Sequence, residues 1–451
     1  MRFNLKGVLV GTAFVLVGSS SFSQFNLSGE VRPRAEFRNG YKTLPDTINK
    51  PAFFISQRTR LKFRYDHEKF TFFVSLQDVR TWGNQKQLVA NEANAVSLHE
   101  AWGLVRFGKK WGMKFGRQEV NYDDQRMFGA VNWTQQARSH DMLMFKFMGD
   151  KFKLDVAGAY NQSKENLFNT IYTTTGNYKV ESHIWANYNI KDKVKISGLV
   201  LMLGQQVSFI DSNLIQRNHD NYSLTMGTHV NFKLKDFGGE FNGFYQLGST
   251  ATQVAKSISA FNFKLDLYYK VKNFKFTLGY EILSGQGQTD TSASYGSVSR
   301  SFNPFFGTNH KFNGFMDYFF VGNHLGTVGL QDAYFKFAYK HEKFNIGLDA
   351  HGFFSAAPVL DQNHFNTTGE YKGMHPFIGL ELDLSAGVKI AKWTSLKLGY
   401  SQMFSSATMA ALKGGDRTLF NNWAYVMIVF NPTIFDQKAF QEKKAKKEAD
   451  K

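Results

Sequence analysis

The chain contains no cysteine and only 7 prolines among 451 residues. The absence of cysteine excludes a disulfide scaffold, a thiolate metal site and a lipid-modified N-terminal cysteine. Beyond the N-terminal segment there is no apolar run of about 18 residues, which excludes a helical membrane protein. Acidic residues are also few relative to basic ones, because the formal net charge is +17. We therefore expect an anionic partner such as nucleic acid, lipid headgroups or an acidic solute.

The first residues have the pattern of a secretory signal. Arg2 and Lys6 precede the apolar segment 7–18, and Ser21 and Ser23 are the small residues expected before a cleavage site. An uncleaved anchor helix is the alternative, but the apolar segment is too short to span a bilayer. We predict a signal peptide over 1–23, and export argues against nucleic acid as the anionic partner.

From Phe25 onward, apolar and polar residues alternate with a period of two. In 25–37 one face carries apolar residues such as Phe25, Leu27 and Val31, and the other face carries stacked charges. The same pattern recurs in 56–65, 261–269 and 376–390. A charged face opposite an apolar face is typical of a strand with a water-filled lumen on one side and lipid on the other.

The spacing of the turns predicts the number of strands. Short polar turns occur at 66–69, 108–110, 149–151, 191–193, 235–239, 270–273, 340–343 and 391–393. Longer polar connections occur at 38–51, 83–96, 120–134, 161–177, 205–220, 248–257, 284–329, 354–375 and 405–421. Bacterial barrels have short periplasmic turns and long outer loops. We therefore predict an all-β fold, a transmembrane antiparallel β-barrel of outer-membrane type with about 18 strands.

This barrel is predicted to occupy 24–435, followed by a charged, weakly helical periplasmic tail over 436–451. The longest connection, 284–329, contains a stretch at 312–329 that does not alternate. We interpret it as an outer loop, and a loop folded into the pore is the alternative.

The inward charges are the candidate site for transport. The basic residues predicted to line the lumen are Arg32, Arg34, Arg38, Arg58, Arg60, Lys62, Arg64, Arg80, Arg106, Arg117, Arg126 and Arg138. Their predicted acidic neighbours are Glu30, Glu36, Asp78, Glu100, Glu119 and Asp124. Arginine stays charged and binds carboxylates through two parallel hydrogen bonds, so an excess of it favours anions in a pore. The alternative is that these arginines pair with the acids and brace the barrel wall.

Two enzymatic alternatives lack a recognisable motif. His99, His140, His183 and Ser139 could serve a lipid hydrolase, but none lies in a nucleophile context. Asp123 and Asp124 could serve a glycosidase, but adjacent strand residues point to opposite faces. The histidines have no metal-ligand spacing. We therefore predict no catalytic residues, no metal and no cofactor.

Several sequence motifs together resemble those of a known family. They are RPRAEFRNGYKTL (32–44), FISQRTRLKFRY (54–65), SLQDVRTWG (75–83), LHEAWG (98–103), FGRQE (115–119), YDDQR (122–126) and GTNHKFNGFMDYFF (307–320). This set is similar to the alginate-export family, in particular its Bacteroidota-type branch. The resemblance implies an 18-stranded barrel in the bacterial outer membrane, whose arginine-rich lumen passes an anionic polyuronate.

The expected function is a passive channel for anionic solutes, with an acidic polysaccharide such as alginate as one candidate. The alternatives are a weakly selective porin for small nutrients and a structural or adhesive barrel closed by its loops. The expected partners are outer-membrane lipids and lipopolysaccharide together with the anionic solute or polyuronate. A periplasmic protein partner is a further possibility, and no nucleic-acid partner is expected.

Overall fold

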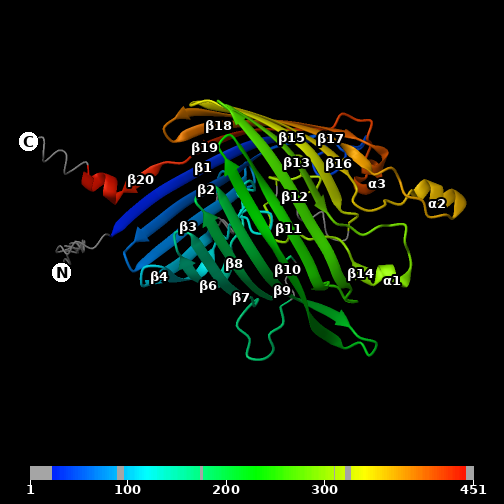
Figure 1. Ribbon diagram of the computed structural model, residues 1–451, viewed down its shortest axis with the longest axis horizontal. Helices are drawn as coiled ribbons and strands as arrows, with labels where there is room; N and C mark the ends of the chain where they lie inside the picture. The colour runs from blue at the N-terminus through cyan, green and yellow to red at the C-terminus, as the bar shows by residue number, and fades with distance from the viewer. Residues whose placement is uncertain (1–22, 89–95, 173–175, 309, 320–326, 443–451) are drawn as a thin grey trace, which may run out of the picture.

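The computed structural model describes residues 23–88, 96–172, 176–308, 310–319 and 327–442. Eighteen long antiparallel strands form a barrel (Figure 1). The first nine are β1 (Gln24–Asn39), β2 (Ala52–Asp66), β3 (Phe70–Thr81), β4 (Ser97–Phe107), β5 (Trp111–Gln118), β6 (His140–Met148), β7 (Phe152–Tyr160), β8 (Val180–Ile190) and β9 (Val194–Ile210). The others are β10 (Gln216–Leu234), β11 (Phe237–Ser249), β12 (Ser257–Val271), β13 (Phe274–Leu283), β15 (Leu330–Lys340), β16 (Phe344–Phe354), β17 (Phe377–Ala391), β18 (Thr394–Ser405) and β19 (Asn422–Phe430).

The barrel closes between its first and last long strands. β1 pairs with β2 on one side and with β19 on the other, both antiparallel. Closure leaves no unpaired strand edge in the hydrocarbon, the condition for a sheet to span a membrane. Two short strands add to the sheet: β14 (Val298–Ser299) pairs with the start of β12, and β20 (Thr433–Asp436) pairs with the start of β1. The prediction of an 18-stranded barrel is confirmed.

The two ends of the barrel differ in the length of their connections. Both the start of β1 and β20 lie at the end with the eight short turns, which we call the turn end (Figure 1). The opposite end, the loop end, carries α1 (Ala293–Gly296), α2 (Gln362–Thr368) and α3 (Ala407–Lys413). Among these helices of the described chain, none is long and apolar enough to cross a membrane. By the rule for bacterial barrels, the turn end is periplasmic.

One predicted long connection is wrong. Residues 205–220 were expected to form a polar loop, but β9 and β10 continue through most of them and leave a turn of only 211–215. The two strands pair in register out to Ile210 and Gln216. Backbone pairing therefore extends this hairpin beyond the point where the alternation of the sequence fades.

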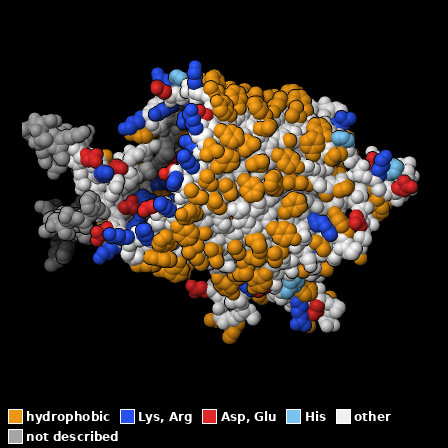
Figure 2. All heavy atoms as spheres, viewed as in Figure 1, with side chains coloured by type: hydrophobic (Ala, Val, Ile, Leu, Met, Phe, Trp, Pro, Cys, Tyr) orange, Lys and Arg blue, Asp and Glu red, His pale blue; other side chains and the backbone are white. Residues whose placement is uncertain are grey.

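The outward face of the strands is apolar, as the alternation predicts. Leu265 on β12 points outward and is 37% exposed, whereas its neighbour Lys264 is buried inside. Apolar side chains cover the flank of the barrel, while Lys and Arg gather around the opening at the turn end (Figure 2). An apolar outer band is the surface that a barrel presents to lipid.

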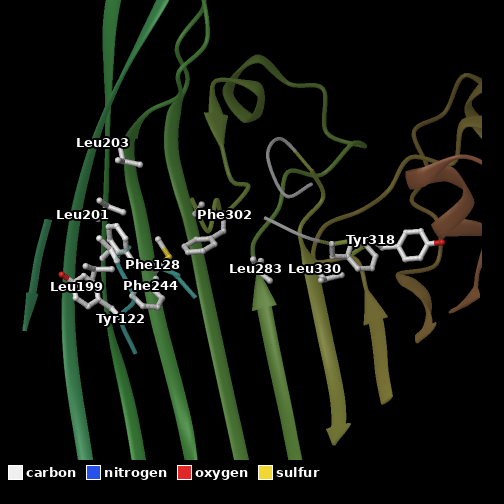
Figure 3. Packing of buried hydrophobic residues seen from close by; sticks show 14 of the residues in the cluster. Tyr122, Phe128, Leu199, Leu201, Leu203, Phe244, Leu283, Phe302, Tyr318 and Leu330 are labelled. Carbon is white, nitrogen blue, oxygen red and sulfur yellow. The ribbon is translucent and has the colours of Figure 1, made fainter. Parts of the chain in front are cut away.

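Two loop segments fold into the barrel and pack against its inner wall. The first infolded segment is 119–139, and the second is 299–319, of which residue 309 lies outside the described residues. Phe128 and Phe302 from these segments are buried near Leu201 of β9 and Phe244 of β11 (Figure 3). The two segments also pair directly, through a bridge between Phe128 and Phe306. For the non-alternating stretch 312–329, the alternative of a loop folded into the pore is therefore correct over its described residues 312–319.

The chain ends are described only in part. The predicted signal peptide over 1–23 lies almost wholly outside the described residues and stays a prediction. Of the predicted tail, Asp436 ends β20 and 437–442 are helical. The remaining tail residues, 443–451, lie outside the described chain.

Candidate functional site: the charged lumen

Arg32 of β1 points into the barrel and holds the first infolded segment by its backbone. Its guanidinium donates hydrogen bonds to the carbonyl oxygens of Asn132 (2.7 Å) and Thr134 (3.0 Å). It also donates to Oε1 of Gln135 at 2.9 Å. The side chain is buried. Arg32 therefore positions this segment across the lumen.

Arg34 and Arg38, on the same face of β1, share one carboxylate. Both guanidinium groups lie 2.8 Å from an oxygen of Glu36. Arg34 also lies over the ring of Trp133 in the first infolded segment, 4.2 Å from its centroid. Trp133 in turn stacks on His310 of the second segment, with ring centroids 3.9 Å apart. Cation–π and stacking contacts thus join wall, first segment and second segment.

The basic residues of β2 are buried and paired in the middle of the strand and more exposed toward the turn end. Arg58 pairs with Glu30 at 2.6 Å, and Arg60 donates to Gln77 at 2.7 Å. Both of these arginines are buried. Lys62 makes no ion pair with any described residue. Arg64 pairs with Asp66 at 2.6 Å and is exposed at the turn end.

Three predicted lumen residues lie on the outward phase of their strands. Asp78 and Arg80 of β3 alternate with the buried inward Gln77 and pair with each other at 2.7 Å. Arg117 of β5 is in phase with the outward Phe115 and pairs with the exposed Asp141 at 2.7 Å. All of them lie near the loop-end limits of their strands. Their placement in the lumen was wrong, because alternation continues beyond the apolar band, where outward residues meet water.

A cluster of a histidine and two glutamates lies on the inner wall. Potential ligand atoms of His99, Glu100 and Glu119 lie within 4.8 Å of one another. However, His99 Nε2 already contacts Glu119 at 2.7 Å, and the Arg60 guanidinium lies 3.6 Å from the same carboxylate. Glu100 accepts hydrogen bonds from the indole of Trp102 and from the amide of Glu119. The cluster therefore has the character of a hydrogen-bonded ion-pair network, and its cationic neighbour opposes metal binding. Arg106, farther toward the turn end, donates to Thr71 at 2.8 Å.

The predicted residues Asp124 and Arg126 anchor the first infolded segment to the opposite wall. Asp124 lies 3.0 Å from Nζ of Lys264 on β12. Burial opposes its charge, but Lys264 and neighbouring donors outweigh this and hold the pKa of Asp124 well below its usual range. Arg126 forms a two-point contact with Glu281 of β13, at 2.7 and 2.5 Å. Its guanidinium also donates to Asn313 of the second segment at 2.9 Å.

The remaining candidates also serve the packing of the segments. Arg138 donates to the carbonyl of Gly307 at 3.1 Å. Asp123 accepts from Trp185 and Ser197, on the other side from the partners of Asp124, and burial raises its pKa. The two aspartates thus do not face each other as a catalytic pair would. His183 contacts Glu181 and Tyr122.

A cavity of about 830 Å³ opens at the turn end, against the inner wall of β15 to β18. Small inward residues, among them Gly347 and Gly387, leave room for it. Its lining includes five lysines, Lys340, Lys343, Lys389, Lys392 and Lys397, against the acids Glu342 and Asp349. Lys340, Lys389 and Lys397 lie on the inward phase of their strands and are exposed to the lumen. We call this space the lysine cavity. It lies at the end of the barrel where Lys and Arg gather around the opening (Figure 2).

Comparison with protein families decides the affiliation. The model of the family described as "Alginate export" matches residues 23–419. The chain belongs to the alginate-export family. No curated protein sequence matches it.

Solved porins share the fold of this family member. The chain is similar to Pseudomonas aeruginosa OprD (12% identity, 91% of this chain and 96% of that chain covered, TM-score 0.56). It is also similar to Acinetobacter baumannii OccAB4 (12% identity, 91% of this chain and 98% of that chain covered, TM-score 0.59). At such identities the likeness concerns the fold alone. The family and the fold are those of outer-membrane transport channels, and the chain is a β-barrel of the bacterial outer membrane.

Sequence reasoning missed two features of this alginate-export barrel. The first is the lysine cavity, whose residues come from five strands and the turns between them, and whose lysines look like ordinary strand-end lysines. The second is the inward course of 119–139. A signal for it exists at 199–203, LVLML, because a strand that is apolar on both faces needs an apolar neighbour inside the barrel.

Proposed function

We propose that the chain is a passive outer-membrane channel that favours anionic solutes, with an acidic polysaccharide such as alginate as the candidate substrate. The observation that carries this proposal is the lysine cavity. Its inward lysines are exposed to the lumen at the turn end, so a solute crossing the barrel meets them. Rings of basic side chains are a known device for anion selection, and a low-dielectric wall strengthens their field.

The buried arginines of β1 and β2 support the pore differently. The guanidinium of Arg32 donates to the first infolded segment. Arg34 pairs with Glu36, and Arg58 pairs with Glu30. They keep the segment in place, and they add positive charge to the surrounding wall. Replacing them would disturb the packing of the lumen, so they are poor positions for a test of selectivity.

The test is a reversal potential measured in a planar bilayer under a KCl gradient. Wild type should favour chloride at 0.1 M salt, where the Debye length is about 10 Å, and the preference should shrink at 1 M. The triple variant Lys340→Gln, Lys389→Gln, Lys397→Gln should lose much of it. A matched control replaces Lys50, Lys164 and Lys372, three exposed lysines of the loop end, by glutamine. A cation-selective wild type, or a control variant that loses as much selectivity, would refute the proposal.

A weakly selective porin for small nutrients is the second candidate, and the infolded segments favour it. Phe128, Phe302 and Met316 are fully buried inside the barrel, so the segments occupy lumen that a polymer would need. Addition of an oligouronate separates the two candidates. Block of the current by the oligouronate, and not by a neutral oligosaccharide of equal length, supports the acidic polysaccharide. A chloride-selective pore indifferent to both favours the porin.

A further inference from the structure

A second cavity lies inside the barrel at the loop end. Its volume is about 430 Å³, within the range of small-molecule sites. It is bounded by the inner wall of β9 to β12 on one side and by the start of the second infolded segment on the other. Gln205, Ser223 and Gln246 belong to the wall, and Ser299, Asn303 and Phe305 to the segment. We call it the amide cavity.

The lining of the amide cavity is polar and almost uncharged. Among the described residues that line it, Lys256 alone is charged, and the others carry amides, hydroxyls and a few apolar groups. Amides and hydroxyls both donate and accept hydrogen bonds, which matches the hydroxyl groups of a sugar. The lysine cavity at the other end of the barrel has the opposite character, since charges dominate its polar groups. The two cavities therefore suit different chemical groups.

Part of this lining is held firmly and part is available. Gln246 donates to the carbonyl of Asn303 at 2.7 Å and accepts from its amide at 2.8 Å, which ties the segment to the wall. By contrast, the side chains of Gln205, Ser223 and Ser299 make no hydrogen bond with any other described residue. Ser223 is buried on the inward face of β10. The cavity thus offers polar groups without partners on a framework that is already fixed.

Phe305 supplies an apolar surface in the same cavity. Its backbone has φ +43°, a region that bulky residues rarely occupy. The conformation is supported by a hydrogen bond from its amide to Oδ1 of Asn303, at 3.0 Å. Backbone strain of this kind persists where the surroundings hold it, and it often marks a binding site. The ring is only partly buried, so the apolar C–H face of a pyranose could pack on it.

We propose that the amide cavity binds a neutral pyranose unit of a carbohydrate. The hydroxyl groups of the sugar bond to Gln205, Ser223 and Ser299, and its apolar face packs on Phe305. This site goes beyond the proposed anion selectivity, because no anionic group is needed for binding. A carbohydrate arriving from the loop end would meet this cavity before the lysine cavity.

The test is a titration of the purified full-length barrel with maltotriose, in which ligand-observed NMR detects binding. The detergent must lack a sugar headgroup, since that headgroup would compete. Wild type should bind maltotriose, and any binding of an equally long oligouronate at the lysine cavity should be unchanged by substitutions in the amide cavity. The double variant Ser223→Ala, Ser299→Ala should weaken maltotriose binding about tenfold, because two hydrogen bonds are lost. Phe305→Leu keeps apolar volume but removes the ring, and should also weaken binding.

The matched control is Ser385→Ala, an inward serine of the lysine cavity with no hydrogen bond to a described residue. It should bind maltotriose as wild type does. No binding by wild type, or equal binding by the double variant, would refute the site. Oligouronate binding that the double variant weakens as strongly as maltotriose binding would refute its neutral specificity. The chloride preference measured in a KCl gradient should be unchanged in the double variant, so this test and that of anion selectivity can fail separately.

Discussion

The contact between Arg126 and Glu281 should decide whether the first infolded segment stays in the lumen. The two side chains are 2% and 1% exposed and meet at two points. Arg126→Met leaves the Glu281 carboxylate buried without its cation, which costs about 3–5 kcal/mol. Because Arg126 belongs to the segment and Glu281 to the wall, release of the segment relieves this cost. The population of the open form should therefore rise by roughly two to four orders of magnitude.

A single cysteine can report this opening, because the chain has none of its own. Ala130 lies in the first infolded segment and is 2% exposed. In folded barrels, the Ala130→Cys thiol should react with a maleimide at least a hundredfold faster when Arg126→Met is also present. The single-channel conductance should increase as well, since the segment leaves the lumen.

Two further variants control for this reasoning. Arg217→Met removes an arginine from an exposed pair with Asp211, 3.0 Å apart, and should change the labelling little. The double variant Arg126→Met, Glu281→Leu removes both charges and should restore much of the protection. Unchanged labelling of Ala130→Cys in the Arg126→Met background would refute the role of this pair as an anchor.

Two other predictions concern the membrane itself. Leu265→Arg places a charge on the lipid face and should destabilise the barrel by about 2–4 kcal/mol, measured by denaturant unfolding in lipid. Ser385→Arg, on an inward face, should lower the free energy of unfolding much less. Equal losses would mean that the faces are assigned wrongly. Leu167→Cys, 94% exposed in a loop-end connection, should react with an impermeant maleimide on intact cells, and Asp192→Cys in a turn should not. Labelling of Asp192→Cys alone would reverse the orientation.

The strand count was predictable because lipid and water impose it locally. Alternation and turn length are properties of neighbouring residues, so a barrel of 18 strands follows from short windows of sequence. The same local rule misplaced Asp78, Arg80 and Arg117, because alternation does not mark where the lipid ends. For such residues the depth along the strand matters as much as the phase.

The interior of the lumen was predictable only in part. Arg126 and Glu281 are separated by 155 positions, and no local pattern pairs them. Arg32 is a similar case, since its partners are backbone carbonyls of a segment about 100 residues away. The sequence showed a surplus of inward arginines. Whether each arginine pairs within the barrel or stays available to a solute depends on which loop folds inward.

The apolar inner wall limits how this barrel can be altered. Leu199, Leu201, Leu203 and Phe244 face inward and are covered by the infolded segments. Burial of four such side chains contributes roughly 6–12 kcal/mol in total. Shortening the loops to make a wider nanopore would therefore expose an apolar surface to the water in the pore. The inward residues of the wall and the loops that cover them would have to be changed together, whether by design or by evolution.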